Sequence, residues 1–479
     1  MSAKKTLPLP IDYLYRGLSL NPEGIAAEDE TQRLTYIELV ERVEALAHGL
    51  QQQLPAASRV ALCAQNNISQ LVAYLAIIAG GFIWLPINPK NGPQLNYRLI
   101  EKSKPALLLV DSASKDTVAQ GPLKQLLLDG DATDSCDTVI AQYKDVNFSP
   151  VRANADTIMA IKFTGGTTGE PKGVMQSHHN VAAVVENMQA VFQFQQQDCN
   201  LAVAPLTHGG SHYILPLLAV GGRHLFLRQP APDQIIKAFQ EQEASVSFMP
   251  PTLIYKLLDQ PGINADHLPH LRHLTYSAAP MPPERITQFI ETLGPRLSTV
   301  YGQTEAPMTI TAMSADDMKN PALRASVGRA CKHSEVAILD NNGHSLTAGN
   351  SGEVAVRGDI VMSGYFEESE KNEHAFHNDW LLTGDLGFLD EKGYLFLQGR
   401  SKELIISGGF NVYPAEVENA LMSHPQILDA AVVGIPDEKW GESVMGFVIL
   451  AEDSPITEDE IIAYSREKIA GFKCPKTIK

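Results

Sequence analysis

The chain has 479 residues, more than a single hydrophobic core usually holds, so we expect two or more domains. It is 44% hydrophobic and 19% charged, which is ordinary for a soluble globular protein. With 38 Lys and Arg against 55 Asp and Glu, the formal net charge is −17, which argues against nucleic acid or an acidic membrane as the main partner but leaves an anionic small substrate open.

Strand-like and helix-like segments alternate in the first quarter of the chain. A capping-box pattern at Thr35 and Glu38 predicts an amphipathic helix that runs to about Gln52. Alternation of this kind indicates parallel βαβ units with both sheet faces covered. Residues 112–154 are polar and irregular, so we expect surface connections there. The further predicted elements are strands at 59–64, 81–85 and 106–111 and helices at 69–79 and 94–102.

The alternation resumes after a glycine-rich stretch at 164–174. Each short strand predicted here runs into a polar or proline-rich loop. Because open α/β sheets bind ligands beyond the carboxyl ends of their strands, we expect the functional site at these loops. The predicted elements are helices at 180–192 and 213–220 and strands at 202–205, 245–249, 271–277 and 297–301.

The pattern changes twice toward the C-terminus. Alternating segments at 335–339, 352–357 and 381–388 predict a small strand-rich subdomain at about 328–398. The prediction is therefore an α/β fold: a large N-terminal domain at 1–398 with parallel α/β sheets and this subdomain, a hinge at 399–403, and a small α+β domain at 404–479. The elements predicted in the last domain are a strand after 403, a helix at 414–421, strands at 430–434 and 444–451, and a helix capped by Thr457 and Glu460.

Cysteine usage and the length of apolar runs bear on location. No pair of cysteines has the spacing of a metal site or a redox motif, so free thiols in a reducing cytosol are the simplest interpretation. The N-terminus lacks a signal-peptide core, and the longest apolar region, 71–85, is too short to span a bilayer. We expect a cytoplasmic protein without integral membrane association. The cysteines are Cys63, Cys136, Cys199, Cys331 and Cys474.

The glycine-rich stretch at 164–174 reads Thr-Gly-Gly-Thr-Thr-Gly-Glu-Pro-Lys-Gly-Val. Its glycines let the backbone approach a ligand closely, and its threonines and Lys172 offer hydroxyls and a positive charge, as a polyphosphate requires. The spacing is not that of a P-loop, because two residues, one of them Pro171, separate Gly169 from Lys172. Taken alone, the stretch could also be a flexible β-turn.

Four more motifs follow in order: Ser277-Ala-Ala-Pro280, Tyr301-Gly-Gln-Thr-Glu305, Leu382-Thr-Gly-Asp385, and Gly399-Arg400 continued by Gly-Gly-Phe-Asn-Val-Tyr-Pro at 408–414. With the glycine-rich stretch they resemble the acyl-adenylate-forming superfamily of acyl-CoA synthetases, luciferases and nonribosomal peptide synthetase adenylation domains, over nearly the whole chain. The resemblance implies a ligase that joins a carboxylic acid to the α-phosphate of ATP, expels pyrophosphate and passes the acyl group to CoA. The implied cofactors are ATP, Mg²⁺ and CoA.

The resemblance implies that the glycine-rich stretch holds the β- and γ-phosphates. Thr304 would contact the α-phosphate, and Glu305 would hold Mg²⁺, because a hard cation that bridges phosphate oxygens needs a carboxylate ligand. Lys172 would add positive charge at the same place. Without its motif, Glu305 would more often be a surface acid. The implied phosphate-binding residues of the stretch are Thr164, Gly165, Gly166, Thr167, Thr168 and Gly169.

A second set of residues resembles the family's nucleoside-binding positions. Tyr301 would stack on adenine, beside Gly302 and Gln303, and Asp385 would accept hydrogen bonds from both ribose hydroxyls. Arg400 would make a second ribose or phosphate contact. From local sequence alone, Asp385 could equally be a turn residue and Arg400 a surface ion-pair partner. The small residues that resemble the purine-edge segment, or that simply pack in a strand, are Ala278, Ala279 and Pro280.

Three further features resemble positions that serve the acid and the thiol. Lys402 falls at the position of the family's hinge. Domain rotation at this hinge lets one cleft serve adenylation first and thiol attack second. The alternative interpretation is that Lys402 is an ordinary solvated lysine. Ser407, Gly408 and Gly409 resemble the loop that lines the pantetheine channel, with a plain turn as the alternative. His208 resembles an acyl-pocket residue and is grouped with the catalytic candidates, with a structural histidine as the alternative.

The chain departs from the family at its last residues. The family's final segment is of the type Pro-x-x-x-x-Gly-Lys, whose lysine reaches the attacking carboxylate, whereas this sequence ends on Gly-Phe-Lys-Cys-Pro-Lys-Thr-Ile-Lys at 471–479. We therefore expect a truncated C-terminal domain. Loss of one such donor slows a reaction by on the order of 10²–10³.

The sequence leaves more than one hypothesis for the acid substrate, for the acceptor of the acyl group and for whether the chain is catalytic. An acid–CoA ligase is the first hypothesis, loading of a carrier protein is the second, and a catalytically impaired nucleotide-binding scaffold is the third. The segment 204–212 carries no acid that could hold an α-ammonium group, which disfavours an amino acid. Small residues at Gly209 and Gly210 favour an uncharged apolar acid, aliphatic or aryl, as in fatty acid metabolism. A homodimer is also possible.

Overall fold

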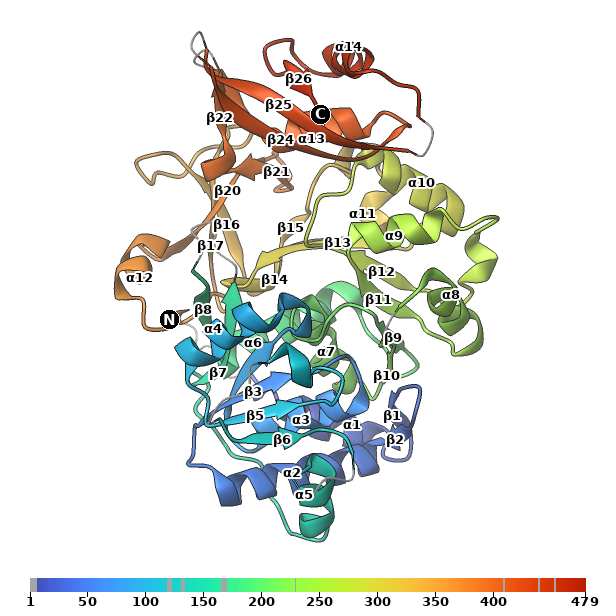
Figure 1. The fold of residues 1–479 in the computed structure, drawn as a ribbon, viewed down its shortest axis with the longest axis vertical. Helices are drawn as coiled ribbons and strands as arrows, with labels where there is room; N and C mark the ends of the chain where they lie inside the picture. The colour runs from blue at the N-terminus through green and yellow to red at the C-terminus, as the bar shows by residue number, and fades with distance from the viewer. Residues whose placement is uncertain are drawn as a thin grey trace.

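The computed structural model describes residues 7–118, 123–130, 134–164, 170–228, 230–407, 410–437, 440–451 and 454–479. In Figure 1 the first part of the chain, in blue and cyan, lies at the bottom of the molecule and the last part, in red, lies at the top. Within the described ranges the strands form a seven-stranded, a nine-stranded and two five-stranded sheets. The predicted α/β class is confirmed. No helix of this part of the chain combines the length and apolar character that crossing a membrane would require.

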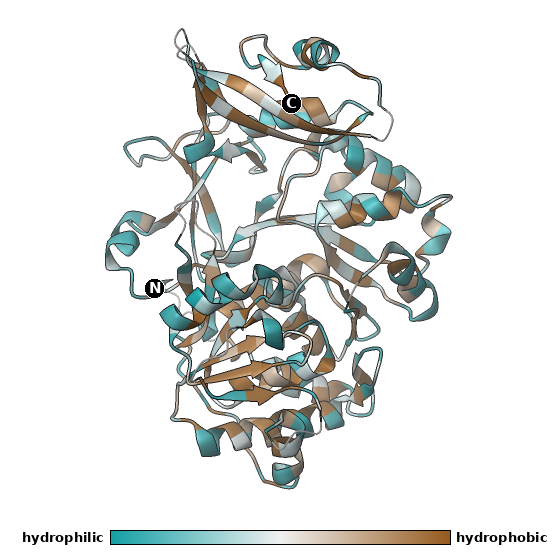
Figure 2. Cartoon of the chain, viewed as in Figure 1, coloured by the Kyte–Doolittle hydropathy of each residue, from teal (hydrophilic) through white to brown (hydrophobic). Residues whose placement is uncertain are grey.

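The seven-stranded sheet has the order β18-β8-β7-β4-β3-β5-β6, and its five strands from β7 to β6 run parallel. Parallel strands are buried on both faces, and β5 accordingly reads Leu-Leu-Leu-Val with every residue buried. These strands appear brown in Figure 2. The bounds are β3 Arg59–Cys63, β4 Ile83–Ile87, β5 Leu107–Val110, β6 Gln125–Leu127, β7 Ile158–Thr164, β8 Lys172–Ser177 and β18 Gly364–Tyr365.

Three helices of this region, α2, α3 and α4, begin within one residue of the predicted start, whereas α1 was not predicted. The capping box is confirmed, because Glu38 N donates to Thr35 Oγ1 at 3.2 Å and Thr35 N donates to the Glu38 carboxylate at 2.8 Å. Such reciprocal bonds satisfy two N–H groups that the helix itself cannot pair. The bounds are α1 Asp12–Leu20, α2 Tyr36–Gln53, α3 Ile68–Ala79 and α4 Pro93–Ser103.

The prediction of irregular structure throughout 112–154 is wrong. This stretch contains β6, which extends the sheet beside β5, and α5 (Cys136–Tyr143). Ser135 caps α5 by accepting a hydrogen bond from Thr138 N at 3.2 Å, and Val139 packs close to Gly49 of α2. The helix is short and carries few apolar residues, so its pattern in the sequence is weak, and its packing on α2 stabilises it.

The nine-stranded sheet has the order β15-β14-β13-β12-β11-β9-β10-β1-β2. The predicted strand at 202–205 is placed wrongly, because β9 ends at Ala202 and residues Ala204 and Pro205 line a cavity instead. Their apolar character reflects that cavity rather than a strand. The bounds are β1 Ile25–Glu28, β2 Arg33–Thr35, β9 Cys199–Ala202, β10 Arg223–Phe226, β11 Val246–Met249, β12 His273–Tyr276, β13 Leu297–Gln303, β14 Ala306–Met313 and β15 Arg329–Ala330.

One hydrophobic core joins the two large sheets. It contains buried residues of six helices, α1, α2, α3, α5, α6 and α7, together with Trp84 of the seven-stranded sheet and Phe226 of the nine-stranded sheet. The shared core fixes the two sheets relative to each other, which matters because the cavity described below draws residues from both. The helix bounds are α6 His178–Phe192, α7 Ile214–Leu218, α8 Pro232–Glu241, α9 Pro251–Leu258, α10 Pro283–Leu293 and α11 Ala315–Met318.

The predicted strand-rich region is confirmed as an antiparallel sheet of five strands, order β16-β17-β20-β19 with β21 on β20. The last strand, β21, continues to Arg400. The domain boundaries and the hinge at 399–403 stay predictions. The bounds are β16 Glu335–Leu339, β17 Gly352–Arg357, α12 Ser369–Ala375, β19 Phe376–His377, β20 Trp380–Leu389 and β21 Leu395–Arg400.

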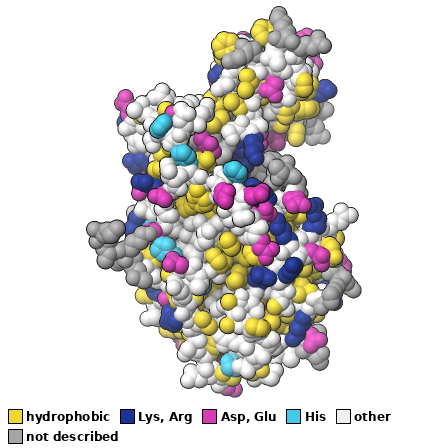
Figure 3. All heavy atoms as spheres, turned by 90° about the vertical axis from the view of Figure 1, so that its left-hand side faces the viewer, with side chains coloured by type: hydrophobic (Ala, Val, Ile, Leu, Met, Phe, Trp, Pro, Cys, Tyr) yellow, Lys and Arg dark blue, Asp and Glu magenta, His cyan; other side chains and the backbone are white. Residues whose placement is uncertain are grey.

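The C-terminal residues fold around a small core of their own. Its sheet has the order β23-β22-β25-β24 with β26 on β25, and two helices accompany it, as an α+β domain requires. Figure 3 shows an indentation of the surface between this domain and the rest of the molecule. The bounds are β22 Ile405–Ser407, β23 Phe410–Val412, α13 Pro414–Met422, β24 Ile427–Asp437, β25 Gly441–Leu450, α14 Glu458–Lys468 and β26 Thr477–Ile478.

Candidate active site

A cavity of about 550 Å³ lies where strands of the two large sheets end. The lining includes residues that follow β12 and end β13, and residues of β7 and of the segment after β9. The structure thus brings together six predicted site residues from four separate motifs. These cavity-lining residues are Thr164, His208, Ala278, Gly302, Gln303 and Thr304.

Two of the eight described non-glycine residues with positive φ line this cavity. Ala278 has φ +73° and Met308 has φ +64°, left-handed values that L-residues adopt at a cost, and both residues line the cavity. Gly302 lies against Met308 so closely that a Cβ there would come within 2.5 Å of the Met308 amide nitrogen. Strained positions of this kind persist only where the surroundings impose them, and they cluster at functional sites.

Tyr301, Asp385 and Arg400 form one hydrogen-bonded group from three motifs. The Tyr301 hydroxyl donates to Asp385 Oδ2 at 2.5 Å, and Arg400 Nε lies 3.2 Å from Asp385 Oδ1. Cross-strand pairing of Asp385 with Arg400 between β20 and β21 positions the pair. Burial raises the pKa of Asp385, opposed by the Tyr301 hydrogen bond and the Arg400 charge, and burial also raises the pKa of Tyr301.

The Asp385 carboxylate keeps capacity for a diol. A carboxylate offers about four lone-pair sites, and Tyr301 and Arg400 occupy two of them. The Tyr301 ring is only 8% exposed, so its packing inside the protein fixes the phenol that orients Asp385. Stacking of Tyr301 on adenine and ribose binding by Asp385 stay predictions.

Glu305 and Lys172 are connected through a residue that sequence reasoning missed, Tyr365. The Tyr365 hydroxyl donates to Glu305 Oε1 at 2.9 Å, and Lys172 Nζ lies 5.0 Å from the centre of the Tyr365 ring. Antiparallel pairing of β18 with β8, Tyr365 opposite Val174, brings these side chains together. Burial, and then the Glu305 charge, raise the pKa of Tyr365, so it stays a hydroxyl donor. Nothing in the local sequence around Tyr365 marks it, because its partners are distant in the chain.

The residues present fit a magnesium ion that phosphate groups help to hold. Among the residues that the structure describes, no three His, Cys, Asp or Glu side chains come close enough to form a metal cage of their own. Mg²⁺ bound with nucleotide phosphates usually needs only one or two carboxylates, since waters and phosphate oxygens complete its shell. Glu305, whose backbone carbonyl accepts a hydrogen bond from Met362 N at 2.8 Å, is positioned to supply one.

The remaining predicted residues lie away from the cavity or outside the described ranges. Ala279 and Pro280 are exposed next to Ala278, Lys402 is exposed after β21, and Ser407 is buried at the end of β22. Their predicted roles stay predictions. The predicted residues that fall outside the described residues are Gly165, Gly166, Thr167, Thr168, Gly169, Gly408 and Gly409.

His208 also lines the cavity. Its Nδ1 lies 2.9 Å from Thr207 Oγ1, which holds the ring in place. Burial, and then the nearby charge of Lys162, lower the pKa of His208, so the ring is neutral at pH 7. A lining role in the acyl pocket and any proton transfer stay predictions.

A buried lysine, Lys162 of β7, also lines the cavity and was missed by the sequence reasoning. It is 8% exposed, its Nζ lies 3.3 Å from His212 Nε2, and it sits 5.2 Å from the centre of the Trp84 ring. Burial lowers the pKa of Lys162 to about 7, and burial together with Lys162 lowers the pKa of His212 well below its usual range. The one available signal was a lysine inside the apolar run Ile-Met-Ala-Ile-Lys-Phe at 158–163.

Replacing Lys162 with Met is expected to raise the free energy of unfolding at pH 7 by about 1–4 kcal/mol. Burial lowers the pKa of Lys162 from 10.5 to about 7, so protonation favours the unfolded chain. The resulting loss in the free energy of unfolding of the wild type is absent above pH 10.5, grows as the pH falls, and is complete below about pH 7. Urea unfolding of both proteins across this range measures it, and a variant less stable than the wild type at pH 7 would contradict it.

Comparison with known proteins agrees with this geometry. The family model described as AMP-binding enzyme matches residues 16–366, and the model described as AMP-binding enzyme C-terminal domain matches residues 416–479. Both matches lie on the elements that form the cavity and the small C-terminal domain, respectively.

Two relatives and one solved structure illustrate the similarity. The medium/long-chain-fatty-acid–CoA ligase FadD8 of Mycobacterium tuberculosis is 34% identical over 330 residues, 67% of this chain and 58% of that protein. The feruloyl-CoA synthase of an Amycolatopsis species is 29% identical over 468 residues, 97% of this chain and 93% of that protein. The o-succinylbenzoate CoA synthetase MenE of Bacillus subtilis, solved with its acyl-adenylate intermediate, superposes with a TM-score of 0.85 at 26% identity, covering 99% of this chain and 94% of that one.

The family match spans well over half of the chain, and the structural similarity extends over nearly all of it. The match to FadD8 spans less than two thirds of that protein's own length. The protein is a member of the AMP-binding enzyme family, with both the AMP-binding region and its C-terminal domain.

Proposed function

We propose that this chain is an AMP-forming acid–CoA ligase, which activates a carboxylic acid with ATP to an acyl-adenylate and transfers the acyl group to CoA. The observation that carries the proposal is that the motif 301–305 places Thr304 in the cavity lining, while hydrogen bonds join its Tyr301 to Asp385 and its Glu305 to Tyr365. Relatives named as CoA ligases and CoA synthases support the same reaction type.

Each residue has a separate task in this proposal. Bound ATP supplies an electrophilic α-phosphorus, and Mg²⁺ reduces the repulsion between the phosphates and the attacking carboxylate. Asp385, held by Tyr301 and Arg400, orients the ribose. Glu305 would hold the metal ion, and Thr304 would present its hydroxyl to the α-phosphate. These groups are in place before the reaction, so they stabilise developing charge without reorganising.

The acid is expected to occupy the part of the cavity beside His208. That part is lined by Pro205, His208, Gly209 and Phe248, and a Cβ at Gly209 would come within 2.5 Å of the Phe248 ring. The glycine therefore keeps the ring close to the cavity wall. CoA would have to enter from another direction, because the nucleotide and the acid occupy this cavity in the first half-reaction.

The proposal extends to the location of the protein in the cell. All five cysteines are free and buried, which suits a reducing compartment and supports a cytoplasmic location. A carrier protein as acceptor and a homodimer stay predictions.

The proposed function is tested by measuring pyrophosphate release when the full chain is incubated with ATP and a panel of aliphatic, aryl and dicarboxylic acids. Pyrophosphate release is expected to require both ATP and an accepted acid, and AMP and a thioester are expected to form when CoA is added. Release of ADP and phosphate, or no pyrophosphate with any acid together with no binding of a nonhydrolysable acyl-adenylate mimic, would contradict it. Pyrophosphate release without thioester formation would favour a carrier protein as the acceptor.

A further inference from the structure

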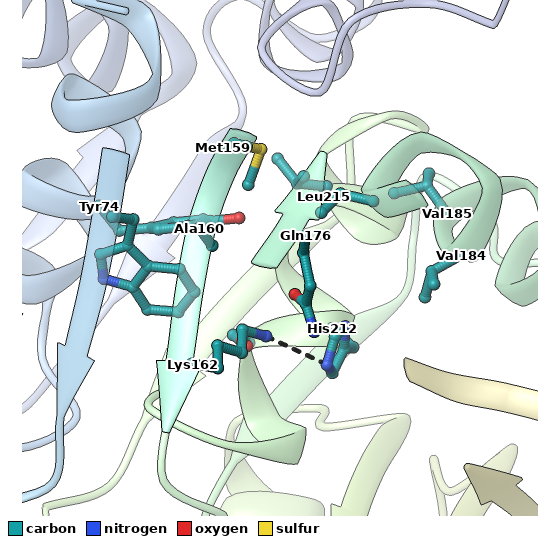
Figure 4. A pocket seen from close by; sticks show the side chains of 12 residues that line it. Tyr74, Met159, Ala160, Lys162, Gln176, Val184, Val185, His212 and Leu215 are labelled. Atoms are coloured by element: carbon teal, nitrogen blue, oxygen red, sulfur yellow. Dashed lines mark hydrogen bonds between the residues drawn. The ribbon is translucent and has the colours of Figure 1, made fainter. Parts of the chain in front are cut away.

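Three polar side chains form an inner wall of the active-site cavity. Lys162, Gln176 and His212 line the cavity of about 550 Å³ and also an enclosed void of about 10 Å³ behind it. Figure 4 shows these three side chains pointing toward one another, with Lys162 bonded to His212. The rest of the void is lined mostly by apolar side chains, among them Val184, Val185 and Leu215. We call Lys162, Gln176 and His212 the polar wall.

When it is protonated, Lys162 carries a charge that the protein itself leaves without an anion. Within the described residues its polar contacts are His212 Nε2 at 3.3 Å and the face of the Trp84 ring, and no carboxylate forms an ion pair with it. An ammonium group has three donors, so two remain for another acceptor. Burying a cation without an anion is unfavourable, which makes Lys162 costly unless a ligand supplies the anion.

Two further buried polar atoms at the wall lack hydrogen-bond partners in the described structure, Gln176 Oε1 and Trp84 Nε1. The Gln176 side chain is fixed, because its Nε2 donates to the Thr304 carbonyl oxygen at 2.9 Å. Buried polar atoms are almost always paired in native proteins, so each unpaired one points to a ligand or a water. The void of about 10 Å³ has room for about one water. A larger ligand group must therefore approach from the main cavity.

The polar wall joins two parts of the cavity lining. Gln176 is bonded to the Thr304 carbonyl oxygen, and His212 lies in the short helix η3 (Gly209–Tyr213), which directly follows His208, where the acid is expected. Burial and the nearby Lys162 lower the pKa of His212 well below its usual range, so His212 stays neutral and does not compete for an anion. The cation at this wall is Lys162 alone among the groups that the structure describes there.

We propose that Lys162 binds a second carboxylate of the acid substrate, so that this chain activates dicarboxylic acids in preference to acids with an apolar end. The inference rests on the proposed function and specifies its substrate class. It replaces the expectation of an uncharged apolar acid. A carboxylate at this place would accept from the Lys162 ammonium, and Gln176 Oε1 would accept from a remaining ammonium hydrogen. The charge of the buried cation would then be neutralised only when substrate is bound.

A matched pair of acyl-sulfamoyl adenosines tests the proposal by calorimetry on the full chain. Both carry acyl chains of the same length, one ending in a carboxylate and the other in a methyl group. The wild type is expected to bind the carboxylate-ended compound about 10- to 100-fold more tightly. The reason is that a hydrogen bond to a charged group stabilises a complex by a free energy that corresponds to this ratio of affinities, and the methyl-ended compound cannot form it. Lys162→Met is expected to abolish or reverse that preference while it keeps or improves binding of the methyl-ended compound.

Lys237→Met serves as the control, because Lys237 is an exposed lysine of α8 and should leave the preference unchanged. A retained or improved affinity for the methyl-ended compound cannot come from misfolding. Equal weakening of both compounds by Lys162→Met would overturn the proposal and assign Lys162 to the reacting carboxylate or to folding. Equal binding of both compounds by the wild type would also overturn it. If the wild type binds neither compound more tightly than AMP, the proposed ligase function fails instead.

Discussion

The Asp385→Ala variant is expected to lower kcat/KM for ATP by about 10²–10⁴. Two ribose hydroxyls would each lose a hydrogen bond to a charged, mostly buried acceptor, and such bonds contribute about 1.5–3 kcal/mol each. Tyr301 and Arg400 would lose their shared partner as well. Pyrophosphate release at varied ATP measures the effect, and the loss is expected mainly in the KM for ATP.

A matched pair of tyrosine variants separates a binding role of Asp385 from a structural one. Tyr301→Phe removes the hydroxyl that donates to Asp385. Tyr394→Phe removes a similar hydroxyl, which donates to Asp317 Oδ1 at 2.9 Å, and neither Tyr394 nor Asp317 lines the cavity. The first is expected to weaken ATP binding by about tenfold and the second to leave it unchanged. Asp385→Ala with a wild-type KM for ATP would refute the ribose assignment.

The Glu305→Gln variant is expected to lower kcat by on the order of 10²–10³ and to raise the Mg²⁺ concentration that gives half the maximal rate. Gln keeps the size of the side chain and an acceptor oxygen for Tyr365, but it removes the negative charge that a hard cation needs. Pyrophosphate release at varied Mg²⁺ measures both quantities.

Two companion variants control this experiment. Tyr365→Phe leaves the Glu305 carboxylate charged but unoriented, so a smaller loss of about 10-fold is expected. Glu335→Gln removes a carboxylate that is exposed and paired with Arg357 far from the cavity lining, and no change is expected. A wild-type Mg²⁺ dependence in Glu305→Gln would remove Glu305 from the metal site.

Local sequence was sufficient for part of the individual elements. The helices α2 and α14 begin at predicted capping boxes, because the Ser/Thr and Glu of such a box are neighbours in the chain. The strand β9 was misplaced, no helix was predicted at α1, α5, α8, α9 and α10, and no strand was predicted at β1, β2, β6, β10 and β14. Residues near Ala204 are apolar because they line a cavity, and composition alone does not distinguish a cavity wall from a strand.

The site residues also differ in whether the local sequence indicates them. Thr304 and Glu305 were predicted because they lie in one short motif with a clear spacing. Tyr365 and Lys162 were not, because each acts on residues that are distant in the chain, Tyr365 on Glu305 and Lys162 on His212. A tyrosine after a glycine and a lysine in a strand have no local pattern that marks them.

By itself, the sequence determined the α/β class and the family of this protein, and it predicted ordered motifs for nucleotide and metal. The tertiary structure alone decided which of those residues meet and what else lies between them. It joined Asp385 to Arg400 through strand register and to Tyr301 through a hydrogen bond, and it buried Lys162 against Trp84. The physical reason is that motif spacing acts along the chain, whereas burial and pairing of charges depend on which strands become neighbours.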